Sequence, residues 1–393
     1  MYRTTLFLNC IFYLSISLSS CNDPSNTTVP NGFKRTNEYA IHLDEYTSPV
    51  EEYTQYLPSW KGHQAMAFHV RKKGEIKIYG LEDGSLLETL SYSQEGPDSY
   101  RGIYDFHIYN EDSIFLNKRY LYQTYLVDSK FNKSATYQFL DPEIKLDPIS
   151  GIAQSDNSFL PVFNHNRIFQ KTGNTIYLTG SPDKNSDFPE YFDADCMIVS
   201  VDLPSGKVSR LIGYPDRMKG KGWGTMHDGL FADFDTKREQ FILSYASDKH
   251  LYITDNQLNK MKKFLATPEK FSDIKPLPAS YRNNETAYFE FYNKQYVFGS
   301  VLYDSFRNVY YRVALEPDPN GIDMYLRDPL YKPRNMVVMA FDSSFEKIAE
   351  MRLEQTAAGT YLDRCFVNEK GLNIAYVDLT NEDILYYKTF SLE

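Results

Sequence analysis

Tryptophan and cysteine are scarce in this chain of 393 residues, which contains two tryptophans and four cysteines. So few cysteines cannot form the dense disulfide framework of small secreted domains, and no Cys/His spacing typical of a zinc site is present. Basic residues are also in deficit, because 42 Lys and Arg face 52 Asp and Glu and give a net charge of −10 at pH 7. A nucleic-acid partner is therefore excluded, since phosphate binding needs a basic face.

Long apolar runs are missing after the first 20 residues, so no transmembrane helix is expected there. The N-terminus carries Arg3 and an apolar run from Leu6 to Leu18, which has the length of a signal-peptide core. The run ends in Leu18-Ser19-Ser20-Cys21, which resembles a bacterial lipobox. The resemblance implies removal of residues 1–20, lipidation of Cys21 (a palmitate-type anchor) and a place in the bacterial cell envelope, at the outer membrane. An ordinary secretory signal with an incidental cysteine is the alternative.

Aromatic side chains are abundant, because 33 tyrosines and 26 phenylalanines raise the aromatic content to 16%. This content argues against intrinsic disorder, and Tyr, Phe, Ile and Val favour strands. Residues 21–35 are rich in Ser, Thr, Asn and Pro and are predicted to form a flexible tether. From residue 36 to residue 393, short apolar and alternating strands recur between turns, which predicts one domain.

This repetition predicts an all-β fold, a six-bladed β-propeller with about four strands in each blade. The last unit has only three strands, so we expect the leftover strand-like segment Glu38–Leu43 to complete it and close the ring. A seventh, degenerate blade that uses Thr286–Tyr292 and a β-sandwich are the alternatives. The strands predicted to begin the six units are Ala65–Val70, Ile103–Tyr109, Arg167–Lys171, Leu230–Phe234, Tyr296–Tyr303 and Arg364–Val367.

Three sequence segments, together with Cys21, carry a family resemblance: Ser200–Lys207, Phe341–Lys347 and Gln94–Pro97. With them, residues 36–393 resemble the TolB-like or NHL-like propeller lipoproteins of Bacteroides-type bacteria, many of which belong to families without assigned function. The resemblance implies an envelope location and the propeller fold. It brings no catalytic residue with it.

Motifs for catalysis are missing: the sequence has no HExxH, no GxSxG and no P-loop. Glu316–Gly321 imitates the start of a calcium loop, but its twelfth position is Arg327 where a bidentate Glu is needed. The paired acids Asp193/Asp195 and Asp233/Asp235 are interpreted as solvated strand faces. We therefore predict no catalytic residue, no cofactor and no metal site.

In a propeller, the loops that lead into the innermost strands meet near the central channel, where ligands bind. Several such loops carry an Arg, His, Trp or Tyr, side chains that bind carboxylates or stack on sugars and peptide groups. The candidate ligand-binding residues are Trp60, His63, Tyr100, Arg101, His165, Arg167, Trp223, His227, Arg282, Tyr361 and Arg364.

Two functions from different classes follow. The first is a non-catalytic envelope lipoprotein that binds a glycan, a peptide or a partner protein on the channel-mouth face. The alternative is an envelope hydrolase or lyase that uses a His/acid or divalent-cation site in the channel. Cys196 and Cys365 remain after loss of the signal, and we expect buried thiols there, with a Cys196–Cys365 disulfide left open.

Overall fold

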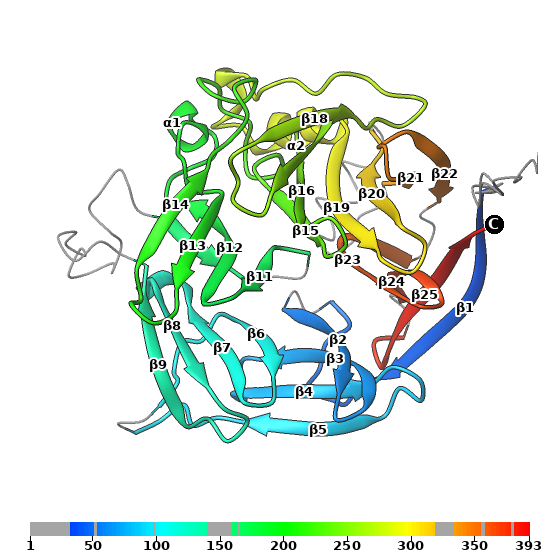
Figure 1. Ribbon diagram of the computed structural model, residues 1–393. Coiled ribbons are helices and arrows are strands. Elements are labelled where there is room, and N and C mark those ends of the chain that lie inside the picture. Colours follow the sequence, from blue (N-terminus) through cyan, green and yellow to red (C-terminus); the bar gives the residue numbers. More distant parts are fainter. Residues whose placement is uncertain are drawn as a thin grey trace, which may run out of the picture.

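Six antiparallel sheets stand around a central axis like the blades of a propeller (Figure 1). The structure is a computed structural model that describes residues 32–50, 53–96, 99–139, 159–163, 166–318, 334–354, 358–378 and 381–393, with only the backbone described for 358–363. The predicted six-bladed, all-β fold is thereby confirmed. The predicted leader of residues 1–20, Cys21 and most of the predicted tether lie outside the described residues.

Each blade begins at the axis and adds its strands outward, so that β2, β6, β10/β11, β15, β19 and β23 surround the channel (Figure 1). The first three blades consist of β2 (Thr54–Trp60), β3 (His63–Val70), β4 (Glu75–Gly80) and β5 (Leu86–Ser91); β6 (Asp105–Asn110), β7 (Ser113–Lys118), β8 (Gln123–Val127) and β9 (Lys133–Gln138); and β10 (Phe159–Val162), β11 (Phe169–Thr172), β12 (Thr175–Pro182), β13 (Ile198–Asp202) and β14 (Val208–Ile212).

The other three blades follow the same order. They consist of β15 (Leu230–Asp235), β16 (Gln240–Tyr245), β17 (His250–Asp255) and β18 (Met261–Leu265); β19 (Val297–Asp304), β20 (Val309–Leu315), β21 (Met336–Phe341) and β22 (Lys347–Leu353); and β23 (Ala358–Asn368), β24 (Gly371–Asp378), β25 (Ile384–Leu392) and β1 (Phe33–His42).

The N-terminal strand closes the ring, as predicted. β1 pairs with β25 from Phe33↔Leu392 to His42↔Ile384, interrupted by a bulge between Arg35 and Asn37. Its end is joined to the first blade, because the His42 amide donates to the Gly84 carbonyl at 3.0 Å. Sheet pairing of the chain ends thus joins the first blade to the last.

One sequence prediction about the strands is wrong, and one alternative is ruled out. The innermost strand of blade 1 is β2, and Ala65–Val70 belongs to the second strand, β3. Thr286–Tyr292 lies in the helix α2 (Glu285–Asn293), capped by the Asn284 side chain, which accepts from the Ala287 amide at 3.0 Å. An Asx cap outweighs the strand preference of the aromatic residues, so no strand of a seventh blade forms there.

The remaining helical pieces are short and lie in connections. They are α1 (Pro189–Phe192), η1 (Arg119–Leu121) and η2 (Ala279–Tyr281). The helices that the structure describes are all too short or too polar to cross a lipid bilayer.

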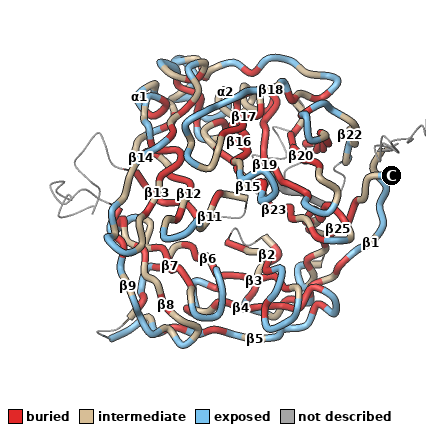
Figure 2. The backbone as a smooth tube through the Cα atoms, viewed as in Figure 1, coloured by how far each residue is buried: buried red, intermediate tan, exposed pale blue. Residues whose placement is uncertain are grey.

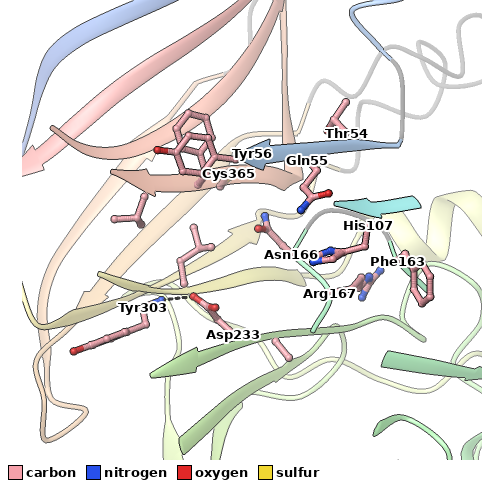
Figure 3. Close-up of a pocket in the computed structure, with 14 residues that line it drawn as sticks. Thr54, Gln55, Tyr56, His107, Phe163, Asn166, Arg167, Asp233, Tyr303 and Cys365 are labelled. Carbon is pink, nitrogen blue, oxygen red and sulfur yellow. Dashed lines mark hydrogen bonds between the residues drawn. The ribbon is translucent and has the colours of Figure 1, made fainter. Parts of the chain in front are cut away.

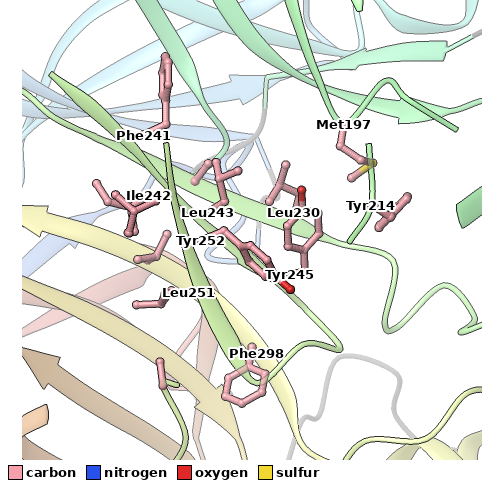
Figure 4. Close-up of a cluster of buried hydrophobic side chains, with 14 of the residues drawn as sticks. Met197, Tyr214, Leu230, Phe241, Ile242, Leu243, Tyr245, Leu251, Tyr252 and Phe298 are labelled. Carbon is pink, nitrogen blue, oxygen red and sulfur yellow. The ribbon is translucent and has the colours of Figure 1, made fainter. Parts of the chain in front are cut away.

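Apolar side chains fill the layers between neighbouring blades, while the outer strands face solvent (Figure 2). Between blades 3, 4 and 5, for example, Leu230, Leu243 and Phe298 belong to one buried cluster (Figure 4). Most of the Tyr and Phe excess is therefore core, because such layers bury large flat rings well.

A buried arginine joins blades 4 and 5. The Arg312 side chain is fully buried over the Phe298 ring, 3.6 Å from its centroid, and donates to the Ser244 hydroxyl and to the carbonyls of Ala266 and Asp248 at 2.7–3.0 Å. These three acceptors satisfy a guanidinium that burial alone would strongly disfavour.

Candidate functional site

The innermost strands all run in the same direction, which gives the ring two distinct faces. We call the face where these strands begin the leading face, and the face where they end the trailing face. Loops that precede an innermost strand, and turns between the second and third strands, lie on the leading face because the sheets are antiparallel.

A hollow of about 260 Å³ lies in the channel and is lined by residues of all six blades (Figure 3). Its wall combines apolar groups with several polar side chains. The lining residues are Thr54, Gln55, Tyr56, His107, Phe163, Asn166, Arg167, Ala232, Asp233, Leu302, Tyr303, Cys365, Phe366 and Val367.

Side-chain hydrogen bonds connect the inner strands around this hollow. The Gln55 amide group donates to the Ile108 carbonyl at 2.8 Å and accepts from the Ile108 amide at 2.7 Å, which links β2 to β6 as a backbone pair would. Asn166 donates to the Ser300 hydroxyl at 2.7 Å across the channel. The hollow therefore has a fixed polar wall, pre-organised by bonds between blades.

Asp233 and His107 are the acid and the imidazole of the wall, and both have shifted pKa values; burial also raises the pKa of the lining residues Tyr56 and Tyr303. The Asp233 carboxylate accepts from the Tyr303 amide at 2.7 Å (Figure 3), while burial raises its pKa to about 6. His107 stacks on Phe169 with ring centroids 3.8 Å apart, and burial lowers its pKa to about 3. Within the described residues no hydrogen bond reaches the His107 ring, so a neutral imidazole is left for a ligand.

Arg167 is the predicted residue that the structure brings into the hollow. It donates to the Leu230 carbonyl and lies over the Phe231 ring, 4.0 Å from its centroid. Its guanidinium thus spans from blade 3 to blade 4 at the channel wall.

Trp60 and His63 lie on the trailing face, because Trp60 ends β2, His63 begins β3, and the two residues pair across the turn between these strands. The expectation that they lead into an innermost strand is therefore wrong. Trp60 is buried and its indole donates to Glu88 at 2.9 Å, whereas His63 is exposed.

Trp223 and His227 precede β15 on the leading face, as expected, but both are buried. The Trp223 indole donates to the Met218 carbonyl at 3.0 Å, and the His227 ring contacts the Tyr296 carbonyl at 3.1 Å. Both side chains therefore make the contacts of core residues, beneath the loop that precedes β15.

Arg364 and Tyr100 are also engaged by the protein itself. Arg364 is buried and donates to the carbonyls of Pro49 and Val50 at 2.9 and 2.7 Å, and the Tyr100 hydroxyl donates to the Phe131 carbonyl at 2.7 Å. Both side chains hold loops in place.

The remaining candidates differ in exposure. Arg101 is exposed on the leading face, and Arg282 lies over the Phe188 ring, 4.8 Å from its centroid. His165, the side chain of Tyr361 and the lipidation candidate Cys21 lie outside the described residues.

Sequence reasoning missed the polar wall of Gln55, His107, Asn166 and Asp233. Asp233 was assigned to a solvated face together with Asp235, yet Asp235 is fully buried and accepts from Tyr310 at 2.5 Å. The one available signal was Asn166, which adopts φ +58°, a conformation that asparagine tolerates better than most residues. Polar residues within short strands are otherwise indistinguishable from surface positions.

Metal and thiol chemistry find little support in the described ranges. No three His, Cys, Asp or Glu side chains gather there into a group able to hold a metal ion. Cys196 and Cys365 lie in blades 3 and 6, are 2% and 0% exposed, and are not joined by a disulfide. Burial raises the pKa of the Cys196 thiol to about 12, which makes it unreactive.

Comparison with known proteins agrees with this architecture. A crystal structure of a DUF4221 family member from Bacteroides vulgatus superposes with a TM-score of 0.75 at 20% identity, covering 93% of this chain and 99% of that one. At this identity the likeness shows the fold alone.

Weaker similarities extend to other proteins. A Bacteroides fragilis protein provisionally described as exported gives a TM-score of 0.48 at 8% identity, covering 93% of this chain and 98% of that one. A streptogramin B lyase gives 0.41 at 11% identity, covering 91% and 98%. No curated protein matches the sequence.

The sequence itself matches one protein family over residues 32–352, from the closing strand to the outer strand of blade 5. That family is described as a domain of unknown function, and the match includes most of the residues that line the channel hollow. The chain belongs to the DUF4221 family.

Proposed function

We propose that the protein is a non-catalytic lipoprotein of the bacterial cell envelope, anchored through Cys21, that binds a sugar or peptide group in the channel. The observation that carries this proposal is the hollow with its fixed polar wall. Residues of all six blades line it: those of blade 3 come from the connection between β10 and β11, and those of the other five blades from their innermost strands.

The size of the hollow limits what it holds. At about 260 Å³ it is at the small end of ligand pockets, which usually measure about 300–1,000 Å³. One sugar ring or one amino-acid side chain fits this space, so the bound group is the end or a branch of a larger molecule. The Asp233 carboxyl and the His107 imidazole offer hydrogen bonds to its hydroxyl or amide groups.

The experiment compares binding of the full mature chain to glycan and peptide arrays with that of a channel variant. We expect His107→Ala with Asp233→Asn to weaken binding at least tenfold, because both side chains face the ligand. His42→Ala with Asp216→Asn is the matched control, since both residues are exposed outside the channel. Equal binding by the channel variant and the native chain would overturn the proposal.

The alternative, an envelope hydrolase or lyase, is favoured by one observation. Asp233, with a pKa raised to about 6 by burial, and His107 line the same hollow, and a carboxyl that titrates near neutrality suits general acid–base chemistry. Turnover of a polysaccharide panel that disappears in Asp233→Asn, with unchanged sugar binding, would support it. Metal analysis of the purified protein tests the divalent-cation version directly.

A further inference from the structure

Two arginines and three tyrosines form a cluster on the leading face between blades 1 and 2, which are neighbours in the ring (Figure 1). Arg71 follows β3, and Arg119 and Tyr120 belong to η1, which follows β7. Tyr53 and Tyr104 come directly before β2 and β6. We call these five residues the arginine–tyrosine cluster. None of them lines the channel hollow.

The tyrosine rings of the cluster contact one another edge to face, and the two guanidinium groups lie over these rings. The Tyr104 ring lies 5.1 Å from both the Tyr53 and the Tyr120 ring centroids. The Arg71 guanidinium carbon lies 4.9 and 5.1 Å from the centroids of Tyr53 and Tyr104, and that of Arg119 lies 5.5 Å from Tyr104. Stacking on aromatic faces fixes both guanidiniums in place without using their hydrogen-bond donors.

Neither guanidinium of the cluster has an anionic partner in the part of the chain that the structure describes. No ion pair or side-chain hydrogen bond involves Arg71 or Arg119 there, and the buried Nε of Arg119 has no acceptor. Other arginines near turns are paired, as Arg238 is with Asp235 and Arg307 with Asp304, each at 3.0 Å. Unused donors on two guanidiniums that approach the same Tyr104 ring suit a carboxylate or sulfate group.

The surroundings add to the positive charge, although the protein as a whole is acidic. Lys72 and Lys73 follow Arg71 in the same turn. Arg101 lies in the loop before Tyr104, and Lys118 is close to this loop, because its Cε lies 3.9 Å from the position that a Cβ on Gly102 would take. This part of the leading face is therefore a local basic patch.

One buried acid faces the two arginines. Burial raises the pKa of Asp105 to about 7 against the lowering effects of Asn117, Arg119 and Arg71, so near neutral pH it cancels only part of their charge. Tyr104, at the centre of the cluster, also has a shifted pKa. Burial raises the pKa of Tyr104, but hydrogen bonds with Tyr53 and Tyr120 and the two arginines together bring it below its ordinary value.

We propose that the arginine–tyrosine cluster binds an acidic sugar, with its carboxylate or sulfate held by Arg71 and Arg119 and its ring packed on Tyr120. Tyr120 is 59% exposed and contacts the Tyr104 ring, over which both guanidiniums lie, so it offers an apolar platform near the anion site. A pyranose ring has an apolar C–H face that fits such a platform, and this favours an acidic sugar over a simple anion.

The position of the chain start favours a sugar over membrane headgroups. The Phe33 ring lies 6.0 Å from the Tyr311 ring, and Tyr311 donates to Asp304 at the trailing end of β19. A lipid anchor upstream of Phe33 is thus attached on the trailing side of the rim. The cluster lies on the leading face, opposite the point where an anchored tether would enter the fold.

The test is calorimetric titration of the full mature chain with trigalacturonate, a sulfated galactose oligosaccharide and neutral galactotriose. We expect one or both acidic probes to bind, more weakly at high salt, and the neutral probe not to bind. Arg71→Gln with Arg119→Gln should weaken acidic-sugar binding at least tenfold. Tyr120→Ala should weaken it severalfold while leaving any binding of inorganic sulfate unchanged.

The matched control is Lys207→Gln with Lys237→Gln, which removes the same charge from exposed turns on the trailing face and should bind like the native chain. No binding of either acidic probe, or an equal loss in the control, would overturn the proposal. Equally tight binding of triaspartate or of anionic-lipid vesicles would overturn the assignment to sugar. Thermal melts verify that the cluster variants fold, and a folded variant that binds trigalacturonate normally also overturns it.

Discussion

The imidazole of His227 is held neutral inside the fold, and this makes stability depend on pH. Burial lowers its pKa from 6.5 to about 4, whereas the unfolded chain takes up a proton near pH 6.5. Because the unfolded state then binds more protons, stability falls as the pH drops through this interval. One pKa unit corresponds to about 1.4 kcal/mol, so His227 should remove about 2 kcal/mol of unfolding free energy between pH 7 and pH 5.

Urea denaturation at both pH values measures this effect as a difference from His227→Gln, which keeps a donor for the Tyr296 carbonyl but does not titrate. The difference in unfolding free energy between the native chain and His227→Gln should be smaller at pH 5 than at pH 7, by the amount given above. The exposed His63→Gln should show no such change. An unchanged difference for His227→Gln would mean that this histidine is charged or exposed in the folded protein.

At the residue scale, sequence predicted where several side chains lie but not what they contact. Trp223 and Arg101 both precede innermost strands, as expected, yet one is 3% exposed and the other points into solvent. The difference comes from the partner groups, such as the Met218 carbonyl that accepts from the Trp223 indole. Such partners are fixed by loop conformation, which residue type alone does not encode.

Among the turns, the one between β4 and β5 is where blade 1 meets the closing strand. Gly84 has φ +68°, and a Cβ built on it would lie 1.9 Å from the Ala40 carbonyl oxygen of β1. We therefore expect Gly84→Ala to push β1 away from blade 1 and to lower the unfolding free energy by at least about 2 kcal/mol beyond the cost of the backbone conformation.

Gly206→Ala supplies the matched comparison, because Gly206 has φ +69° and nothing within 4 Å of its Cβ position. It should cost only about 1 kcal/mol, the price of a left-handed alanine. Denaturant titrations of both variants separate the cost of the left-handed backbone conformation from the cost of the contact with β1. Equal losses of unfolding free energy in the two variants would show that β1 moves away from residue 84 at no energetic cost.

Strand prediction worked where apolar alternation and turn residues agree, and failed where they conflict. β15 and β19 are apolar or alternating strands, and both were predicted to within one residue at each end. β2 was missed because its sequence, Thr-Gln-Tyr-Leu-Pro-Ser-Trp, is polar and contains a proline. An inner strand has one edge on the channel, so polar residues and Pro58 are tolerated there.

For the whole molecule, the six-bladed ring was predictable from the mismatch between its ends. The three strands of the last unit and the spare N-terminal strand together make one blade, and β1 and β25 confirm this pairing. The channel hollow was not predictable, because Gln55, His107 and Asp233 come from three blades and meet only when the ring closes. Residues this far apart in the sequence give no signal that they form one site.

Removing the closing strand tests the ring as a unit. A chain that begins at Leu43 should lose cooperative unfolding and self-associate, because β25 becomes an open sheet edge and the apolar partners of Tyr39 and Ile41 are exposed. A chain that begins at residue 32 is the control. Denaturation and size-exclusion chromatography measure both, and a synthetic peptide of residues 33–42 should restore the monomer. A Leu43 chain with native stability would contradict this account of closure.

The ladder between β1 and β25 also has a mechanical consequence under the proposed anchoring at Cys21. A tensile load between the anchor and a captured ligand reaches the fold at Phe33, the first residue of β1, and passes into the sheet through the pairs that run to His42. Pulled lengthwise, these hydrogen bonds share the force in parallel; peeled sideways, they break one after another. The bulge between Arg35 and Asn37 separates the first three pairs from the other six, so the longer part of the ladder lies behind an interruption, and the strand that closes the ring also transmits this load.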